Sequence, residues 1–380
     1  MSANRSSRKP ALLILTLLFL ALGAGAAAWW WQVLRGHEST DDAYVAGNVV
    51  PLMSRVAGNV VAIHGDDTQL IQAGMPLIDL DPTDAKLQLQ LSESQLAQTV
   101  RQLQQQMAEI KQLDATIALR QAELERLQGD QQRREVLGLS NSVGKEEVLH
   151  ARQGVAEGKA ALQVAIQQRD ALQLKLQHTP LAEQPEVRHA AELVRQAWLE
   201  LQRTRILSPV SGVIAKRSVQ LGGHVAVGSP LLAVVPLDQL WVDANFKEVQ
   251  LAQVRVGQPV ELVADLYGDE VTYHGTIEGL AAGTGSIFSL LPAQNATGNW
   301  LKVVQRLPVR IKLDPQELQQ HPLRLGLSML VKVDVRDGSG PLLTETPKLG
   351  AIASTKVLEV NMQEVDDLVR DIIARNSRAG

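Results

Sequence analysis

Residues 54–82 read SRVAGNVVAIHGDDTQLIQAGMPLIDLDP, and residues 208–236 read SPVSGVIAKRSVQLGGHVAVGSPLLAVVP. The two stretches align without a gap at an offset of 154 residues, and seven of their 29 positions are identical. In both copies apolar residues alternate between glycines and prolines, a pattern typical of short strands joined by tight turns. One copy has too little surface to bury its apolar face alone, so we expect the two copies to form one small β-sandwich. Its expected turn glycines are Gly58, Gly74, Gly212 and Gly228.

Between the two copies the alternation gives way to a repeat of seven residues. The apolar residues at this spacing are Leu89, Leu96, Leu103, Ile110, Ile117 and Leu124. A seven-residue repeat keeps one narrow face of a helix toward the same partner, which is typical of a coiled coil. Residues 83–137 would form a helix about 82 Å long.

The partner of this helix follows it in the sequence. Apolar residues again recur every seven residues, in two groups separated by an interruption at 178–185: Val148, Val155 and Leu162, then Val187, Val194 and Leu201. The segment 138–144 (GLSNSVG) breaks the pattern between the two arms. We therefore predict an antiparallel α-helical hairpin over 83–205, with its tip near 138–144, that projects from a lipoyl-like β-sandwich made of 50–82 and 206–236.

Residues 237–336 alternate apolar and polar positions again, in WVDANF, PVELVADL, VTYHGTIEGL, LPVRIKL and SMLVKVDV. This pattern indicates an antiparallel β-barrel, to which residues 38–49 are expected to add an N-terminal strand. The pattern weakens in the tail, 337–380, where one short amphipathic helix is expected around 365–373. We expect this tail to lie close to a membrane. The predicted fold class is mixed α and β, and elongated.

Residues 11–34 carry no charge and would span about 36 Å as a helix, enough for a hydrocarbon core of about 30 Å. Basic residues precede this stretch and acidic residues follow it, namely Arg5, Arg8, Lys9, Glu38, Asp41 and Asp42. The positive-inside rule then places residues 1–10 in the cytoplasm and the bulk of the chain in the periplasm, with Trp29, Trp30 and Trp31 at the outer membrane interface. A cleavable signal peptide is the alternative, because AGA at 24–26 and AAA at 26–28 fit the cleavage pattern.

Composition excludes several classes of site. The chain has no cysteine, so it has no disulfide, thiolate metal site or lipid-bearing cysteine. Its net charge of -4 is spread without a basic stripe, so a nucleic-acid partner is not expected. The eight histidines are scattered and form no HExxH motif, and the glycines at 138–144 lack the spacing of a phosphate loop. We expect no catalytic residue, no metal and no cofactor.

Four segments carry a family resemblance: TDDAYVAGN at 40–48, LDPTDA at 80–85, WVDANFKE at 241–248 and LLPAQNATGNWLKVVQRLPVRI at 290–311. With the split β-domain and the hairpin, the chain resembles the membrane fusion proteins of bacterial tripartite efflux systems, and among them the EmrA type of the HlyD family. The resemblance covers about residues 11–335.

The resemblance implies a periplasmic adaptor without enzymatic activity. Its implied partners are an inner-membrane major-facilitator drug transporter of the EmrB type, an outer-membrane channel of the TolC type, and further copies of the chain in a trimer or hexamer. The hairpin tip is the implied docking end. The family's tip pattern places an Arg, a Leu and a Ser or Thr where this chain has Arg133, Leu137 and Gly144, so the third position departs from the pattern.

Three alternatives remain at this point. The same adaptor could serve export of aromatic or fatty acid metabolites. A lipoyl or biotinyl carrier subunit would need a lysine just after the first half of the sandwich, where this chain reads Asp-Pro-Thr-Asp at 81–84 and the nearest lysine is Lys86. A cell-envelope scaffold without a transport role would share the architecture.

Overall fold

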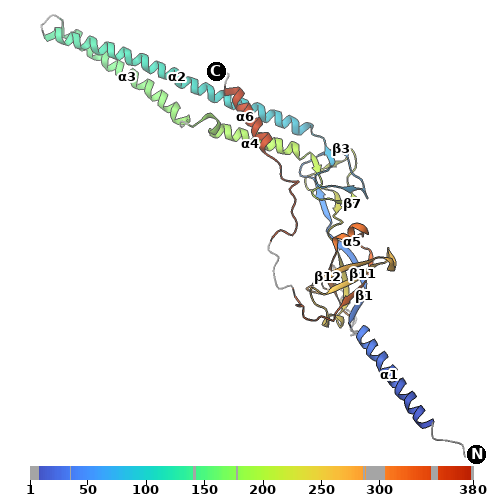
Figure 1. The fold of residues 1–380 in the computed structure, drawn as a ribbon. Helices are drawn as coiled ribbons and strands as arrows, with labels where there is room; N and C mark the ends of the chain where they lie inside the picture. Colours follow the sequence, from blue (N-terminus) through green and yellow to red (C-terminus); the bar gives the residue numbers. More distant parts are fainter. Residues whose placement is uncertain are drawn as a thin grey trace, which may run out of the picture.

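The computed structural model describes residues 8–34, 36–139, 143–176, 179–285, 287, 304–343 and 350–377, with the side chains of helix α1 described for residues 12–25. Helix α1 (Arg8–Leu34) leads into a β-barrel, the barrel into a β-sandwich, and the sandwich into a long helical hairpin (Figure 1). This arrangement confirms the predicted mixed and elongated fold class.

The β-sandwich is built by both copies of the repeat. The half-domain before the hairpin, which contains the first copy, supplies β2 (Val50–Met53), β3 (Gly58–Ile63), β4 (Leu70–Ile71) and β5 (Pro76–Leu80). The half-domain after the hairpin, which contains the second copy, supplies β6 (Arg205–Leu207), β7 (Gly212–Arg217), β8 (His224–Val225) and β9 (Pro230–Val235). One sheet has the order β2-β9-β7-β4 and the other β6-β5-β3-β8, so each sheet takes two strands from each half-domain. The prediction that the copies form one sandwich is confirmed.

Hydrogen bonds between the copies repeat the same symmetry. The amide of Gly228 donates to the carbonyl of Ser54, and the amide of Gly74 donates to the carbonyl of Ser208, both at 2.8 Å. Both serines are buried, and each hydroxyl donates to the carbonyl two residues further on. The sandwich core contains apolar residues from both copies, among them Leu77 and Leu231 at equivalent positions. Neither copy can therefore complete its sheets or its core alone.

At one pair of equivalent positions the two copies have different residue types but the same backbone conformation. Thr68 has φ +72°, and Gly222, which follows it by the repeat offset, has φ +77°. A β-branched residue is strained in this left-handed region, whereas glycine is not.

We expect Gly222→Thr to destabilise the sandwich by about 1–2 kcal/mol, because nothing but the backbone conformation opposes the new side chain. Thr68→Asn should stabilise it by up to about 1 kcal/mol, since asparagine tolerates this conformation. Native-state hydrogen exchange of strands β3 and β7 in the full chain measures both changes. Unchanged exchange in Gly222→Thr would show that the turn tolerates the strain.

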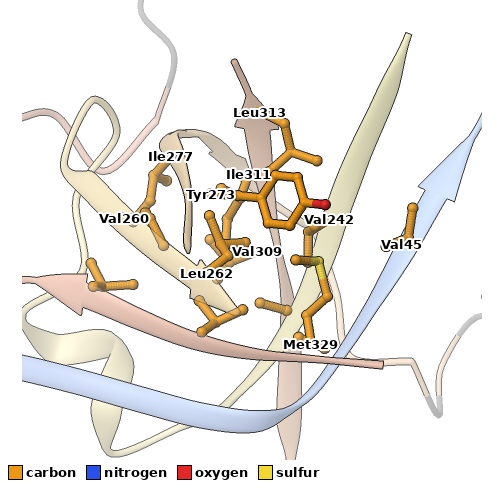
Figure 2. Close-up of a cluster of buried hydrophobic side chains, with 14 of the residues drawn as sticks. Val45, Val242, Val260, Leu262, Tyr273, Ile277, Val309, Ile311, Leu313 and Met329 are labelled. Carbon is orange, nitrogen blue, oxygen red and sulfur yellow. The ribbon is translucent and has the colours of Figure 1, made fainter. Parts of the chain in front are cut away.

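The barrel closes in the order β1-β10-β13-β12-β11-β14. Its strands are β1 (His37–Gly47), β10 (Leu240–Lys247), β11 (Pro259–Ala264), β12 (Thr272–Leu280), β13 (Arg306–Leu313) and β14 (Ser328–Asp334). Alternate residues point inward and form the core in Figure 2, where the Tyr273 ring lies among aliphatic side chains. The Tyr273 hydroxyl donates to the carbonyl of His321 at 2.9 Å, and burial raises the pKa of Tyr273 to about 12.

Short helical segments connect the strands and helices. They are η1 (Leu181–Glu183), η2 (Gln250–Ala252), η3 (Gly268–Glu270) and α5 (Pro315–Gln320). Helix α5 begins with Asp314 as its N-cap, whose carboxylate accepts a hydrogen bond from the Gln316 amide at 2.9 Å.

The hairpin consists of α2 (Thr83–Leu139), α3 (Lys145–Leu176) and α4 (Pro185–Gln202). Its 57-residue first arm is about 86 Å long. Helix α2 packs against α3 toward the tip and against α4 toward the sandwich. The predicted seam is buried or half-buried along α2, with Leu96, Leu103 and Leu124 in its interior. The second arm is interrupted between α3 and α4, in the region where its heptad pattern lapses.

Helix α6 (Gln363–Ser377) covers the predicted amphipathic helix, and the expectation that the tail lies close to a membrane stays a prediction. Helix α6 packs on α2 and α4, separated from α1 by both β-domains (Figure 1). Its buried Val365 and Val369 join the hairpin core, and Arg195 Nε lies 2.7 Å from Asp366 Oδ1. The apolar face of α6 is therefore covered by the hairpin.

Helix α1 covers the stretch predicted as an anchor. Its large apolar side chains from Leu12 to Leu22 are exposed. Within the part of the chain that the structure describes, no helix combines the length and the apolar character needed to span a bilayer. Trp29, Trp30 and Trp31 belong to α1, but their side chains lie outside the described ones.

Candidate docking site at the hairpin tip

The tip is formed by the end of α2 and the start of α3, with residues 140–142 outside the described part. Arg133 and Leu137 lie four residues apart on α2 and therefore share one face of the helix. Both are exposed, with 71% of the Arg133 side chain and 47% of Leu137 accessible to solvent. Gly144 is also exposed but lies at the start of the other arm, where its carbonyl accepts from the Glu147 amide at 3.1 Å. The three residues share one end of the hairpin but not one helical face.

Further apolar side chains are exposed at this end of the hairpin. Val136, Leu139 and Leu149 are 63%, 89% and 54% exposed. The heptad pattern did not single them out, although apolar residues outside the seam near a helix end are a signal for an external partner. Exposed apolar groups gathered at the end of a long coiled coil favour contact with another protein.

The charged side chains of α2 near the tip form exposed ion pairs with one another. Asp130 faces both Arg133 and Arg134, at 3.4 Å and 2.9 Å. Exposed ion pairs of this kind contribute about 0.2–1 kcal/mol at most. Arg133 can therefore exchange its helical partner for an acceptor on a docked protein at little cost.

A polar clamp joins the two arms next to these residues. Glu135 accepts hydrogen bonds from Gln131 Nε2 on its own helix and from Arg152 Nε on α3, both at 2.9 Å. The Gln131 hydrogen bond and then the Arg152 guanidinium lower the pKa of Glu135 below its ordinary value. Gly138 lets α3 approach closely, because a Cβ there would lie 3.2 Å from Val148 Cγ2. The tip therefore presents its exposed face on two arms held together.

We expect Glu135→Gln to speed amide hydrogen exchange in residues 145–152 by about threefold at pH 7, because the pair with Arg152 is lost. Since the folded pKa of Glu135 is lowered, the wild-type pair is present above the ordinary glutamate pKa and is lost only as pH falls through the lowered value. Exchange at pH 5, corrected for the intrinsic rate, should match that at pH 7. The matched control is Glu125→Gln, an exposed carboxylate on the same helix; an equal effect there would contradict the clamp.

The glycines predicted as turn residues of the sandwich divide into two kinds. Gly74 and Gly228 lie in turns with φ +85° and +82°. Gly58 and Gly212 are instead the first residues of β3 and β7. A Cβ at Gly212 would collide with the carbonyl oxygen of Val235, whereas one at Gly58 would make an ordinary 3.5 Å contact with Leu80.

We expect Gly212→Ala to destabilise the sandwich by about 1–3 kcal/mol, because the Val235 backbone must move. Gly58→Ala, at the equivalent position of the other copy, should change its stability by less than about 1 kcal/mol. Native-state hydrogen exchange of β7 and β9 in the full chain measures the difference. Equal effects of the two substitutions would contradict the close approach.

The position of a carrier lysine is taken up by the start of the hairpin. Strand β5 continues through Asp81 and Pro82 into α2, and Asp81 Oδ1 accepts from the Thr83 amide at 3.0 Å, which fixes the beginning of the helix. Lys86 lies within α2. Within the described ranges, no three side chains among His, Asp and Glu are placed to hold a metal ion together.

Two family models match the chain. The model described as "EMRA, alpha-helical hairpin domain" matches residues 83–204, and the one described as "AAEA-like beta-barrel domain" matches residues 239–334. The matched segments coincide with the hairpin and with the C-terminal strands of the barrel.

Curated relatives match over most of the chain. "Multidrug export protein EmrA" of Escherichia coli is 48% identical over 349 residues, which cover 92% of this chain and 90% of that protein. "Multidrug export protein EmrA" of Haemophilus influenzae is 44% identical, covering 99% and 96%. "Fatty acid resistance protein FarA" of Neisseria gonorrhoeae is 46% identical, covering 97% and 93%.

Proposed function

Because the chain belongs to the EmrA family of membrane fusion proteins, we propose that it bridges an inner-membrane transporter of the EmrB major-facilitator type to an outer-membrane channel of the TolC type. Members of this family are adaptors without enzymatic activity, and they work with a transporter and an outer-membrane channel. The observation that carries the proposal is the exposed apolar tip at the end of an arm about 86 Å long, directed away from α1 (Figure 1).

Membrane attachment through α1 is part of the proposal. Residues 11–34 carry no charge, with basic residues before them and acidic residues after them, which supports a single pass with a cytoplasmic N-terminus. In this arrangement Trp29, Trp30 and Trp31 anchor the outer interface, and the barrel, sandwich and hairpin extend into the periplasm.

The second part of the proposal concerns the residues of the hairpin tip that contact the channel. Arg133 and Leu137 offer a charge and an apolar group on one exposed face, which supports their role in contacting the channel. Gly144 offers only its backbone, so the contact at that position lacks a hydroxyl. The narrow seam of the coiled coil supports lateral packing of several hairpins in a trimer or hexamer.

The exported compounds are proposed to be hydrophobic drugs, with fatty or aromatic acids as the second candidate. The relative named for fatty acid resistance, 46% identical to this chain, favours that second candidate. No residue of the adaptor supplies the energy of transport in this proposal, so that energy comes from the transporter.

A cysteine-specific crosslink tests the bridging role, because the chain has no cysteine of its own. Leu137→Cys, carrying a bifunctional reagent, is expected to capture an outer-membrane channel in intact cells. Ser39→Cys, at the start of the barrel next to α1, is expected to capture a transporter. The matched control is Leu119→Cys, which is 68% exposed on the same helix but lies about 27 Å closer to the sandwich.

The expected pattern is capture of the channel from position 137 at least about tenfold above that from position 119, read by mass spectrometry of the crosslinked product. Equal capture from both positions would contradict docking by the tip. If position 137 captures no channel and position 39 captures no transporter, the bridging role is overturned.

A further inference from the structure

A cavity of about 500 Å³ lies where the sandwich, the base of the hairpin and the C-terminal tail meet. Strand β2 and the segment after it form one wall, the end of α4 and strand β6 form another, and residues 357–360 of the tail form the third. This volume falls within the range of sites for small organic ligands, about 300–1,000 Å³. The hairpin tip and the proposed bridging role make no use of it.

Most of the lining is apolar. Met53, Ile206 and Leu358 contribute side chains from the three different walls, and Met53 and Leu358 remain 52% and 39% exposed. Large side chains that stay this exposed beside one another form a surface on which a hydrocarbon body would be buried favourably.

The charged lining is mainly basic. Arg55, Arg203 and Arg205 line the cavity, and Glu359 is its single acidic residue. Arg205 also lies 3.5 Å from Asp79, and Arg55 and Arg203 also border a neighbouring polar cavity that contains Asp81, Asp84 and Glu200. The cavity that contains the tail therefore combines an apolar wall with an excess of guanidinium groups.

Arg203 carries an unmet hydrogen-bonding requirement. Its Nε is buried and has no hydrogen-bond partner among the described residues. A buried donor without a partner is destabilising, and a carboxylate is the acceptor whose geometry best suits a guanidinium. The lining therefore has three guanidinium groups and one carboxylate, that of Glu359.

We propose that this cavity binds an amphipathic carboxylate, whose hydrocarbon body lies between Met53, Ile206 and Leu358 and whose head group accepts hydrogen bonds from Arg203. The ligand class is set by the cavity itself, and the proposal does not depend on the bridging role. One wall is a tail segment tied to the sandwich by the Thr355 hydroxyl, which donates to the carbonyl of Pro209 at 2.7 Å. Binding therefore holds the tail against the sandwich.

Photoaffinity labelling of the purified full chain tests the proposal, with a diazirine-bearing dodecanoate as the probe and mass spectrometry to locate the adducts. Adducts are expected in residues 51–55, 202–209 and 357–360, and unlabelled dodecanoate should compete them away. The diazirine-bearing alcohol of the same length should label these residues about tenfold less, because it cannot accept a charge-assisted bond from Arg203. Hydrogen exchange of residues 350–362 should slow in the presence of dodecanoate.

Arg203→Gln is expected to reduce labelling by the carboxylate about tenfold. The control Arg188→Gln removes an exposed arginine from α4, the helix that ends immediately before Arg203, and should leave labelling unchanged. Leu358→Trp fills the cavity from the tail and should reduce labelling even if Arg203→Gln fails to fold, as judged by circular dichroism. Equal labelling by acid and alcohol, adducts spread over the chain without preference for the lining, or full labelling of folded Arg203→Gln and Leu358→Trp would each overturn the proposal.

Discussion

The exchange of strands between two half-domains is the interaction on which the rest of the structure depends. Each sheet of the sandwich contains two strands from before the hairpin and two from after it. Neither half-domain can therefore form a complete sheet without the other. The ends of the insertion, at β5 and β6, are themselves hydrogen-bonded neighbours. The insertion must therefore leave and return at one place, and an antiparallel hairpin is the regular structure that does so over many residues.

This constraint also determines how rigid the hairpin is at its base. The helix on the outgoing side begins directly after β5, with Asp81 fixing its first turn, so no flexible linker separates the sheet from the helix. The second arm of the hairpin is less rigid because it is interrupted between α3 and α4. Helix α6 packs beside that break, where Val365 and Val369 become fully buried. Burial of two such side chains contributes about 3–6 kcal/mol as an upper estimate, comparable to a large part of a small domain's stability.

The internal repeat and the heptad period made the sandwich and the hairpin predictable from the sequence. The repeat at 154 residues is visible because turn and strand-edge positions tolerate few residue types, and the heptads are visible because one seam stays buried along α2. The location of α6 was not predictable in the same way. Its amphipathic pattern shows that one face needs a partner but carries no information about which surface supplies it. Val136, Leu139 and Leu149 were missed because the heptad pattern selects only the residues of the seam.

At Gly58 and Gly212 the two copies agree in sequence but differ in structural surroundings. These glycines occupy equivalent positions and look interchangeable in an alignment, yet only Gly212 lies against a backbone carbonyl, that of Val235. The equivalent of that carbonyl near Gly58 belongs to Asp81, where the chain turns away into α2 instead of continuing toward the barrel. The asymmetry therefore arises at the two exits from the sandwich: one leads to the hairpin and the other to the barrel. The two halves share one fold, and their differences follow from what each half must connect.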